Sequence, residues 1–191
     1  MRWLPSDNTG FNIKITMRRK YLPAHARVLD LFCGSGLMYK NVYAGKVEEY
    51  LGIDKHRIHD ENLCIKINNA YYVKNNDINK YNVFDLDDYG SPWDLFYLIL
   101  NKYTGQEATF FITDGLKLHQ NVDGDVTRWV SATEKIPSGM NIPGLSRWYV
   151  DIFATMLLDV QNRYNLKIIN PLYAFNARAS TCYWTFSIIK E

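Results

Sequence analysis

The chain has 191 residues, of which 47% are hydrophobic, and a formal net charge of only +2, so its overall charge does not indicate a polyanionic partner. No apolar run reaches the roughly 18 residues that span a bilayer, and the N-terminus lacks the apolar segment of a signal peptide. The three cysteines are too few and too scattered for a disulfide framework or a zinc site, so we expect one cytoplasmic domain over residues 1–191 that binds neither a metal nor a membrane.

The first predicted element is a short basic helix over residues 10–22. Residues 1–47 contain eight Lys or Arg against two acidic residues, so the N-terminal arm, residues 1–25, is more basic than the rest of the chain. Such an arm could steer the phosphates of RNA or DNA, with Arg18 and Arg19 as contacts. An ordinary solvated helix face explains the same charges equally well.

A strand, a glycine turn, a helix and a second strand are predicted next. The first strand covers 27–32, the helix about 36–45 and the second strand 49–54. Glycines in the turn let the backbone approach a ligand where a Cβ would collide. Asp54 at the end of the second strand can accept both hydroxyls of a ribose. This pattern indicates a nucleoside-binding βαβ unit.

The details of this unit favour one nucleoside. Tyr39 stands where a dinucleotide-binding fingerprint has its third glycine, and no Lys-Ser or Lys-Thr pair follows the turn, as a P-loop would require. Asp30 at the end of the first strand would repel a pyrophosphate but suits a cationic ligand such as S-adenosylmethionine (SAM). The segment Asp30–Gly36 resembles motif I of the class I SAM-dependent methyltransferases. A glycine turn in another α/β protein is the alternative.

That resemblance implies which residues surround the cofactor. The glycine turn would contact SAM, Asp54 would bind its ribose, and Lys55 or His56 would line the adenine. The implied contacts from this unit are Asp30, Phe32, Cys33, Gly34, Ser35, Gly36, Asp54 and Lys55. His56 and His59 do not predict a metal, because no third distant ligand matches them.

Residues 58–78 are predicted to form a helix followed by a short strand. The helix covers 58–69, and the strand is Tyr71–Val73. Asp77 and Ile78 would then follow the third strand, where Asp77 resembles the acid that accepts the adenine amino group of SAM in this fold. A turn aspartate without a ligand is the alternative for Asp77.

The fourth predicted strand, 82–87, leads into Asp85–Pro92, which reads D-L-D-D-Y-G-S-P. This stretch resembles the D-x-D-P-F/Y-G-S-P motif of the tRNA guanosine dimethyltransferases, which methylate the exocyclic 2-amino group of guanine. Asp88 stands where that family has proline, and motif I here takes a different form. The chain is also too short for that family's additional C-terminal domain.

A helix and a fifth strand follow this stretch. Ser91 is a good N-cap for a helix over 92–103, and the strand covers 108–113. Thr113 and Asp114 at the end of the strand resemble the T-D pair of the same family.

A long irregular stretch, residues 115–145, is predicted to form an insertion on the substrate side of the sheet. Its basic residues interleave with Trp, which suits single-stranded or flipped nucleotides, and a loop of this length is often a functional lid. A merely covering loop is the alternative. The candidate substrate contacts in this region and in the loop 172–180 are Lys117, Arg128, Trp129, Arg147 and Arg178.

A helix over 146–164 and two strands, 166–169 and 181–189, complete the chain. The last two strands are too close for a helical crossover, so they should be antiparallel. The predicted fold class is α/β: a Rossmann-like class I methyltransferase domain with a seven-stranded, mostly parallel sheet, one antiparallel strand and helices on both faces.

The resemblance implies a SAM-dependent methyltransferase that methylates an exocyclic amino group of a base in RNA, with guanine of tRNA as one option, and releases S-adenosylhomocysteine. Asp87 would accept an N–H bond and the proton, Tyr89 would stack on the flipped base, and Asp85 would contact the cofactor or pair with a buried donor. A DNA, small-molecule or protein acceptor is an alternative, as is an inactive SAM-binding or RNA-binding subunit. The expected partner is a nucleic acid, with a partner subunit or a homo-oligomer as a further option.

Overall fold

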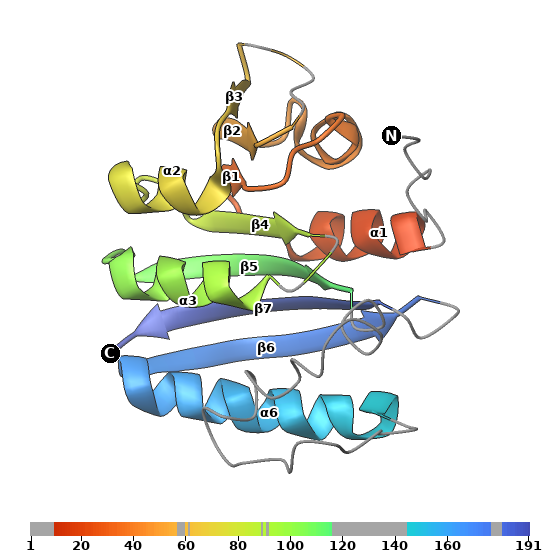
Figure 1. The fold of residues 1–191 in the computed structure, drawn as a ribbon, viewed down its shortest axis with the longest axis vertical. Helices are drawn as coiled ribbons and strands as arrows, with labels where there is room; N and C mark the ends of the chain where they lie inside the picture. The colour runs from red at the N-terminus through yellow and green to blue at the C-terminus, as the bar shows by residue number, and fades with distance from the viewer. Residues whose placement is uncertain are drawn as a thin grey trace.

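Seven strands form a single sheet, in the order β3-β2-β1-β4-β5-β7-β6 (Figure 1). The computed structural model describes residues 10–56, 60, 62–88, 90, 92–115, 145–176 and 181–191. The strands are β1 (Arg27–Asp30), β2 (Glu49–Asp54), β3 (Cys64–Lys66), β4 (Val83–Asp87), β5 (Glu107–Asp114), β6 (Leu166–Phe175) and β7 (Cys182–Lys190). The helices are α1 (Phe11–Tyr21), the short π-helix η2 (Tyr39–Tyr43), α2 (Asn69–Asn75), α3 (Trp93–Lys102) and α6 (Leu145–Tyr164).

The direction of the strands confirms the predicted sheet. Strands β1 to β5 pair in parallel, while β7 pairs antiparallel with both β5 and β6, so β7 is the one reversed strand. The order of the parallel strands reverses between the neighbours β1 and β4. Ligands of such sheets bind outside the carboxyl ends of the strands at this reversal. The topology therefore places the candidate site at the ends of β1, β2 and β4.

The two faces of the sheet are covered by different helices. Helices α2, α3 and α6 cover one face, where Phe96 of α3 and Phe153 of α6 belong to the larger hydrophobic core. Helices α1 and η2 cover the other face, where Val42 and Tyr43 pack on Val28 in a smaller core. Helices on both faces were predicted and are confirmed. No helix in the described part of the chain is long and apolar enough to cross a bilayer.

One stretch of the chain differs from the prediction. Residues 64–66 form the edge strand β3 where a helix was expected, and Tyr71–Val73 lie in helix α2 where a strand was expected. The side chain of Asn68 caps α2 by accepting a hydrogen bond from the N–H of Tyr71 at 2.9 Å. This cap and the burial of Tyr72 and Val73 outweigh the β-propensity of the segment, which is a weak local preference.

Candidate functional site

The glycine turn after β1 and the acid at the end of β2 lie in contact. Gly34 and Gly36 have φ values of +47° and +73°, which favour glycine, and Ser35 between them is exposed. The N–H of Gly34 donates to Oδ2 of Asp54 at 3.2 Å, and the N–H of His56 donates to Oδ1 at 2.7 Å. The fold thus brings together the turn and the acid that the sequence assigns to the cofactor.

Asp30 lies beneath this turn and is only 1% exposed. Its Oδ1 accepts a hydrogen bond from the N–H of Phe32 at 3.1 Å, and its Oδ2 accepts one from the hydroxyl of Tyr50 at 2.8 Å. Burial and repulsion from Asp85 raise the pKa of Asp30 well above its ordinary value, although the two hydrogen bonds oppose the shift. Asp30 therefore fixes the turn from inside the protein, and its direct contact with a ligand stays a prediction.

Cys33 has a packing role in the turn. A Cβ placed on Gly52 would lie 2.6 Å from Sγ of Cys64 and 2.8 Å from Sγ of Cys33, so the turn closes tightly on β2 and β3 only because residue 52 is glycine. Burial raises the pKa of the Cys33 thiol well above its usual range, which argues against a reactive thiolate. Among the described residues, no three His, Cys, Asp or Glu side chains lie together in a way that could hold a metal ion.

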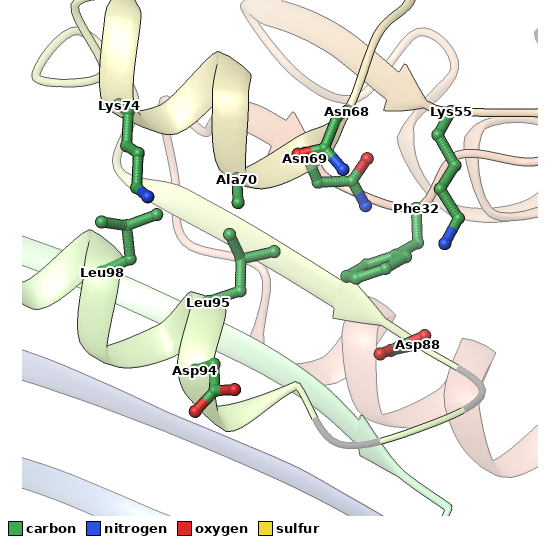
Figure 2. A pocket seen from close by; sticks show the side chains of 10 residues that line it. All are labelled: Phe32, Lys55, Asn68, Asn69, Ala70, Lys74, Asp88, Asp94, Leu95 and Leu98. Atoms are coloured by element: carbon green, nitrogen blue, oxygen red, sulfur yellow. The ribbon is translucent and has the colours of Figure 1, made fainter.

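A pocket of about 360 Å³ opens beside the turn, lined by the ends of β1 and β2 and by α2 and α3 (Figure 2). This volume lies within the range of small-molecule sites. Phe32 and Leu95 give it apolar walls, and Lys55 and Asn69 bring polar groups to it. Asn69 is 8% exposed, and its Oδ1 has no hydrogen-bond partner among the described residues. An acceptor buried without a partner is costly, so Asn69 is a candidate ligand contact that sequence reasoning missed.

The predicted adenine contacts Asp77 and Ile78 are wrongly placed for that role. Because Tyr71–Val73 are helical, Asp77 follows the end of α2 and precedes β4. It therefore lies near the amino ends of the strands, whereas the site lies at their carboxyl ends. Asp77 accepts a hydrogen bond from the N–H of Asn79 in a local turn, and Ile78 is fully buried in the core. The turn-aspartate alternative is the one the structure supports.

Asp85 on β4 is fully buried and forms an ion pair with a helix on the face of the sheet. The guanidinium of Arg18 in α1 donates to both of its carboxylate oxygens, from Nε to Oδ2 at 2.7 Å and from Nη2 to Oδ1 at 2.6 Å. The hydroxyl of Tyr43 donates to Oδ2 at 2.5 Å. Asp85 thus pairs with a buried donor, one of its two predicted roles. The prediction that Arg18 contacts nucleic acid is wrong, since Arg18 is 2% exposed and its charge is already paired.

Asp87 lies two residues further along β4, on the same face and closer to solvent. The ammonium of Lys14 bonds its Oδ1 at 2.6 Å, and the side chain of Asp87 is 15% exposed. Burial alone would raise the pKa of Asp87, but attraction to Lys14 and Arg18 outweighs it and lowers the pKa below its ordinary value. Asp87 is therefore ionised near neutral pH and can accept a hydrogen bond.

The loop after β4 is held to the end of β5. The N–H of Gly115 donates to the carbonyl of Gly90 at 3.1 Å, and the indole N–H of Trp93 donates to Oδ2 of the buried Asp114 at 2.9 Å. The T-D pair predicted at the end of β5 thus helps to fix this loop. Tyr89 and the predicted N-cap Ser91 lie outside the described residues.

The other candidate substrate residues are distributed as follows. Arg19 is exposed and donates to the backbone carbonyl of Asn41, so α1 and η2 are tied together there. Arg147 falls in the first turn of α6. The remaining candidates, Lys117, Arg128, Trp129 and Arg178, lie outside the described residues, as does most of the predicted insertion 115–145.

Comparison with known proteins identifies the fold. No protein-family model and no curated protein matches the chain. Among solved structures, M. jannaschii TYW2 in complex with AdoMet matches with a TM-score of 0.57 and 8% identity over 100% of this chain and 79% of its own. The Burkholderia thailandensis 1,6-didemethyltoxoflavin-N1-methyltransferase, with bound 1,6-didemethyltoxoflavin and S-adenosylhomocysteine, matches with a TM-score of 0.55 and 10% identity over 97% and 80% of the two chains.

A third structure, a Clostridium thermocellum protein provisionally described as an rRNA methylase, has a TM-score of 0.53 and 12% identity over 95% of this chain and 97% of its own. At these identities the likeness establishes the fold. The chain has the Rossmann-like class I methyltransferase fold that the sequence predicts.

Proposed function

We propose that the protein is a SAM-dependent methyltransferase that methylates an exocyclic amino group of a nucleobase in RNA. The proposal rests on one observation, the grouping of candidate ligand-binding residues at the carboxyl ends of the parallel strands. The glycine turn with Asp54, the pocket beside it and the ionised Asp87 all lie at the ends of β1, β2 and β4, where this fold binds its ligands.

The residues of this edge match the chemistry of SAM. Asp54 would accept the ribose hydroxyls, and the bond from the N–H of Gly34 to its carboxylate keeps it beside the glycine turn. The pocket would take the adenine, with Phe32 and Leu95 against the ring and Oδ1 of Asn69 accepting its amino group. Solved relatives of the same fold hold AdoMet or S-adenosylhomocysteine, which supports SAM as the cofactor.

The mechanism requires mainly alignment, because the sulfonium of SAM already activates the methyl group. Holding two reactants in line can supply roughly 7–11 kcal/mol of the barrier in favourable cases. The amine of a base is a poor nucleophile, since its lone pair is delocalised into the ring. Asp87 would accept an N–H bond from that amine and increase its electron density. The methyl group would pass to the amine nitrogen as its bond to the sulfonium breaks, and S-adenosylhomocysteine would leave. The methylated amine would then be a cation and a strong acid, so Asp87 could take its proton even with a lowered pKa.

RNA is the favoured acceptor because of the motif at Asp85–Pro92, which resembles that of enzymes acting on guanine in tRNA. The third solved relative, provisionally described as an rRNA methylase, points the same way. A small heteroaromatic amine is the second candidate, because another relative of this fold is a toxoflavin-precursor N-methyltransferase crystallised with that small molecule. Both acceptors present a planar nitrogen heterocycle to Asp87.

The test is methyl transfer from labelled SAM to separate pools of unmodified tRNA, ribosomal RNA, DNA and small heteroaromatic amines. We expect label in an RNA pool and a loss of about 10²–10⁴-fold in Asp87→Asn, with SAM binding retained in calorimetry. Asp77→Asn is the matched control, since Asp77 lies near the amino ends of the strands and Asn can keep its local turn. Full activity of Asp87→Asn would exclude Asp87 from the reaction, and label only in small amines would support the second candidate.

A further inference from the structure

Helix α1 presents two cations to two carboxylates on β4 with matching spacing. Lys14 and Arg18 are four residues apart, which is about 6 Å along a helix. Asp85 and Asp87 are two residues apart, which is roughly 6.6 Å along a strand. Both ion pairs close at 2.6 Å, so α1 runs against the direction of β4 and fits it at two points.

The two pairs differ in their access to solvent. The side chains of Arg18 and Asp85 are 3% and 0% exposed, whereas those of Lys14 and Asp87 are 21% and 15% exposed. The inner pair is therefore an anchor that no ligand reaches. The outer pair is fixed relative to this anchor, because Lys14 is one helical turn from Arg18 on the same helix face. It lies at the edge of the sheet where an acceptor would enter.

We propose that Lys14 is a positioning residue for methyl transfer, which holds Oδ1 of Asp87 and leaves its second oxygen for the amino group of the acceptor. The inference rests on the proposed function and names a residue in it that the motifs do not contain. A carboxylate offers about four lone-pair sites, so Asp87 can bind the ammonium and an N–H of the acceptor together. Without Lys14, the carboxylate would lose the ion pair that holds its Oδ1.

The surroundings of Asp87 make Lys14 the group to vary. The charged and titratable side chains that face this cluster are Lys14 and Arg18 of α1, Asp85 of β4, Asp30 of β1, Tyr43 of η2 and Tyr183 of β7. The charge of Arg18 is engaged by Asp85, and Asp30 and Asp85 are acids, which can carry only charge of the same sign as Asp87. Removal of Lys14 should therefore raise the pKa of Asp87, and the acid limb of kcat should move to higher pH.

The experiment compares Lys14→Met with Lys14→Arg and with Lys20→Met, an exposed lysine on the same helix. We expect Lys14→Met to lower kcat by roughly 10- to 100-fold, a part of what acid–base assistance supplies, and to shift the acid limb upward. Lys14→Arg should restore most of the rate, and Lys20→Met should match the unmodified protein. Wild-type kcat and an unmoved acid limb in Lys14→Met would overturn the proposal.

A second measurement separates this inference from the proposed function. A carboxyl ¹³C NMR titration follows Asp87 in the protein alone, with Asp87→Asn to assign the signal. A higher titration midpoint in Lys14→Met supports the hold of Lys14 on Asp87 whether or not an acceptor has been found. An unchanged midpoint overturns it. Absence of methyl transfer to every pool would count against the proposed function.

Discussion

The two faces of strand β4 bury different kinds of side chain, although the residues of the two faces alternate along one strand. Phe84 and Leu86 point to the face covered by α3, where Phe84 stacks on Phe110 with a centroid distance of 5.3 Å. Asp85 and Asp87 point to the face covered by α1. The first face is a core of packed rings, and the second combines the smaller apolar core with carboxylates that pair with the cations of one helix.

This difference separates residues that stabilise the fold from Asp87, for which we propose a function. Apolar burial is favourable by itself, at about 25 cal/mol per Å². A buried ion pair gains little over a well-packed apolar pair, because both ions lose their hydration. The charged face is therefore poorly explained by stability. Asp87 lies at the carboxyl ends of the strands, where this fold binds its ligands, which supports the role that we propose for it.

The largest loss of stability is expected from breaking the buried ion pair between Arg18 and Asp85. Arg18→Met should destabilise the protein by about 3–5 kcal/mol in urea denaturation, because it leaves the fully buried Asp85 carboxylate without its ion-pair partner. The double variant Arg18→Met/Asp85→Leu should recover most of this loss, since no unpaired charge is then buried. A double variant as unstable as the single one would mean that the ion pair itself stabilises this face.

A smaller loss of stability is expected from removing a polar contact of the core of rings, the bond from Trp93 to Asp114. Trp93→Phe keeps the ring in the core but removes the indole donor of the buried Asp114 carboxylate. We expect a loss of about 1–3 kcal/mol in urea denaturation, the cost of a buried acceptor that loses a bond. The loop at Gly90 should also become more accessible to hydrogen exchange. A loss below about 0.5 kcal/mol would show that other partners of Asp114 suffice.

Much of the fold was predictable because its signals are local. The glycine turn, the acid at the end of β2 and the buried strands β1, β4 and β5 each follow from a short stretch of sequence. The stretch 58–78 was mispredicted because β3 has three residues, of which only Cys64 is buried, so no alternating pattern marks it. Asp77 was then assigned to the carboxyl ends of the strands instead of the amino ends. Asn68 is a residue type that often caps the start of a helix, and it could have indicated α2.

The role of α1 was not predictable from composition, which shows only that the helix is basic. The signal lies in spacing: Lys14 and Arg18 share the stripe of Phe11 and Ile15, which packs on the sheet. Cations on the apolar stripe of a helix require buried acids opposite them, and Asp85 and Asp87 alternate with apolar residues on a buried strand. Only the tertiary structure shows that these two sets meet.

The smallest change in stability expected on the charged face is a gain: Asp30→Asn should raise the free energy of unfolding, whereas Arg18→Met should lower it. Burial raises the pKa of Asp30 above its ordinary value of 3.8, so at neutral pH the burial of this acid costs the native state free energy. Asp30→Asn should therefore increase the free energy of unfolding at pH 7, by on the order of 1 kcal/mol after the weaker bonds to Phe32 and Tyr50 are counted. SAM affinity in calorimetry should fall by roughly 10-fold, because the cationic ligand loses a nearby negative charge.

The pH dependence gives the check on this sign. As pH falls through the raised pKa of Asp30, the native protein takes up a proton and its penalty is relieved, so the advantage of Asp30→Asn should shrink and vanish near pH 3.8. For Asp87, whose pKa is lowered, the stabilisation by Lys14 is instead complete above about pH 3.8 and lost below it. Urea denaturation of both asparagine variants across this range would show opposite trends. A less stable Asp30→Asn at pH 7 would mean that the bonds to the turn outweigh the burial of its charge.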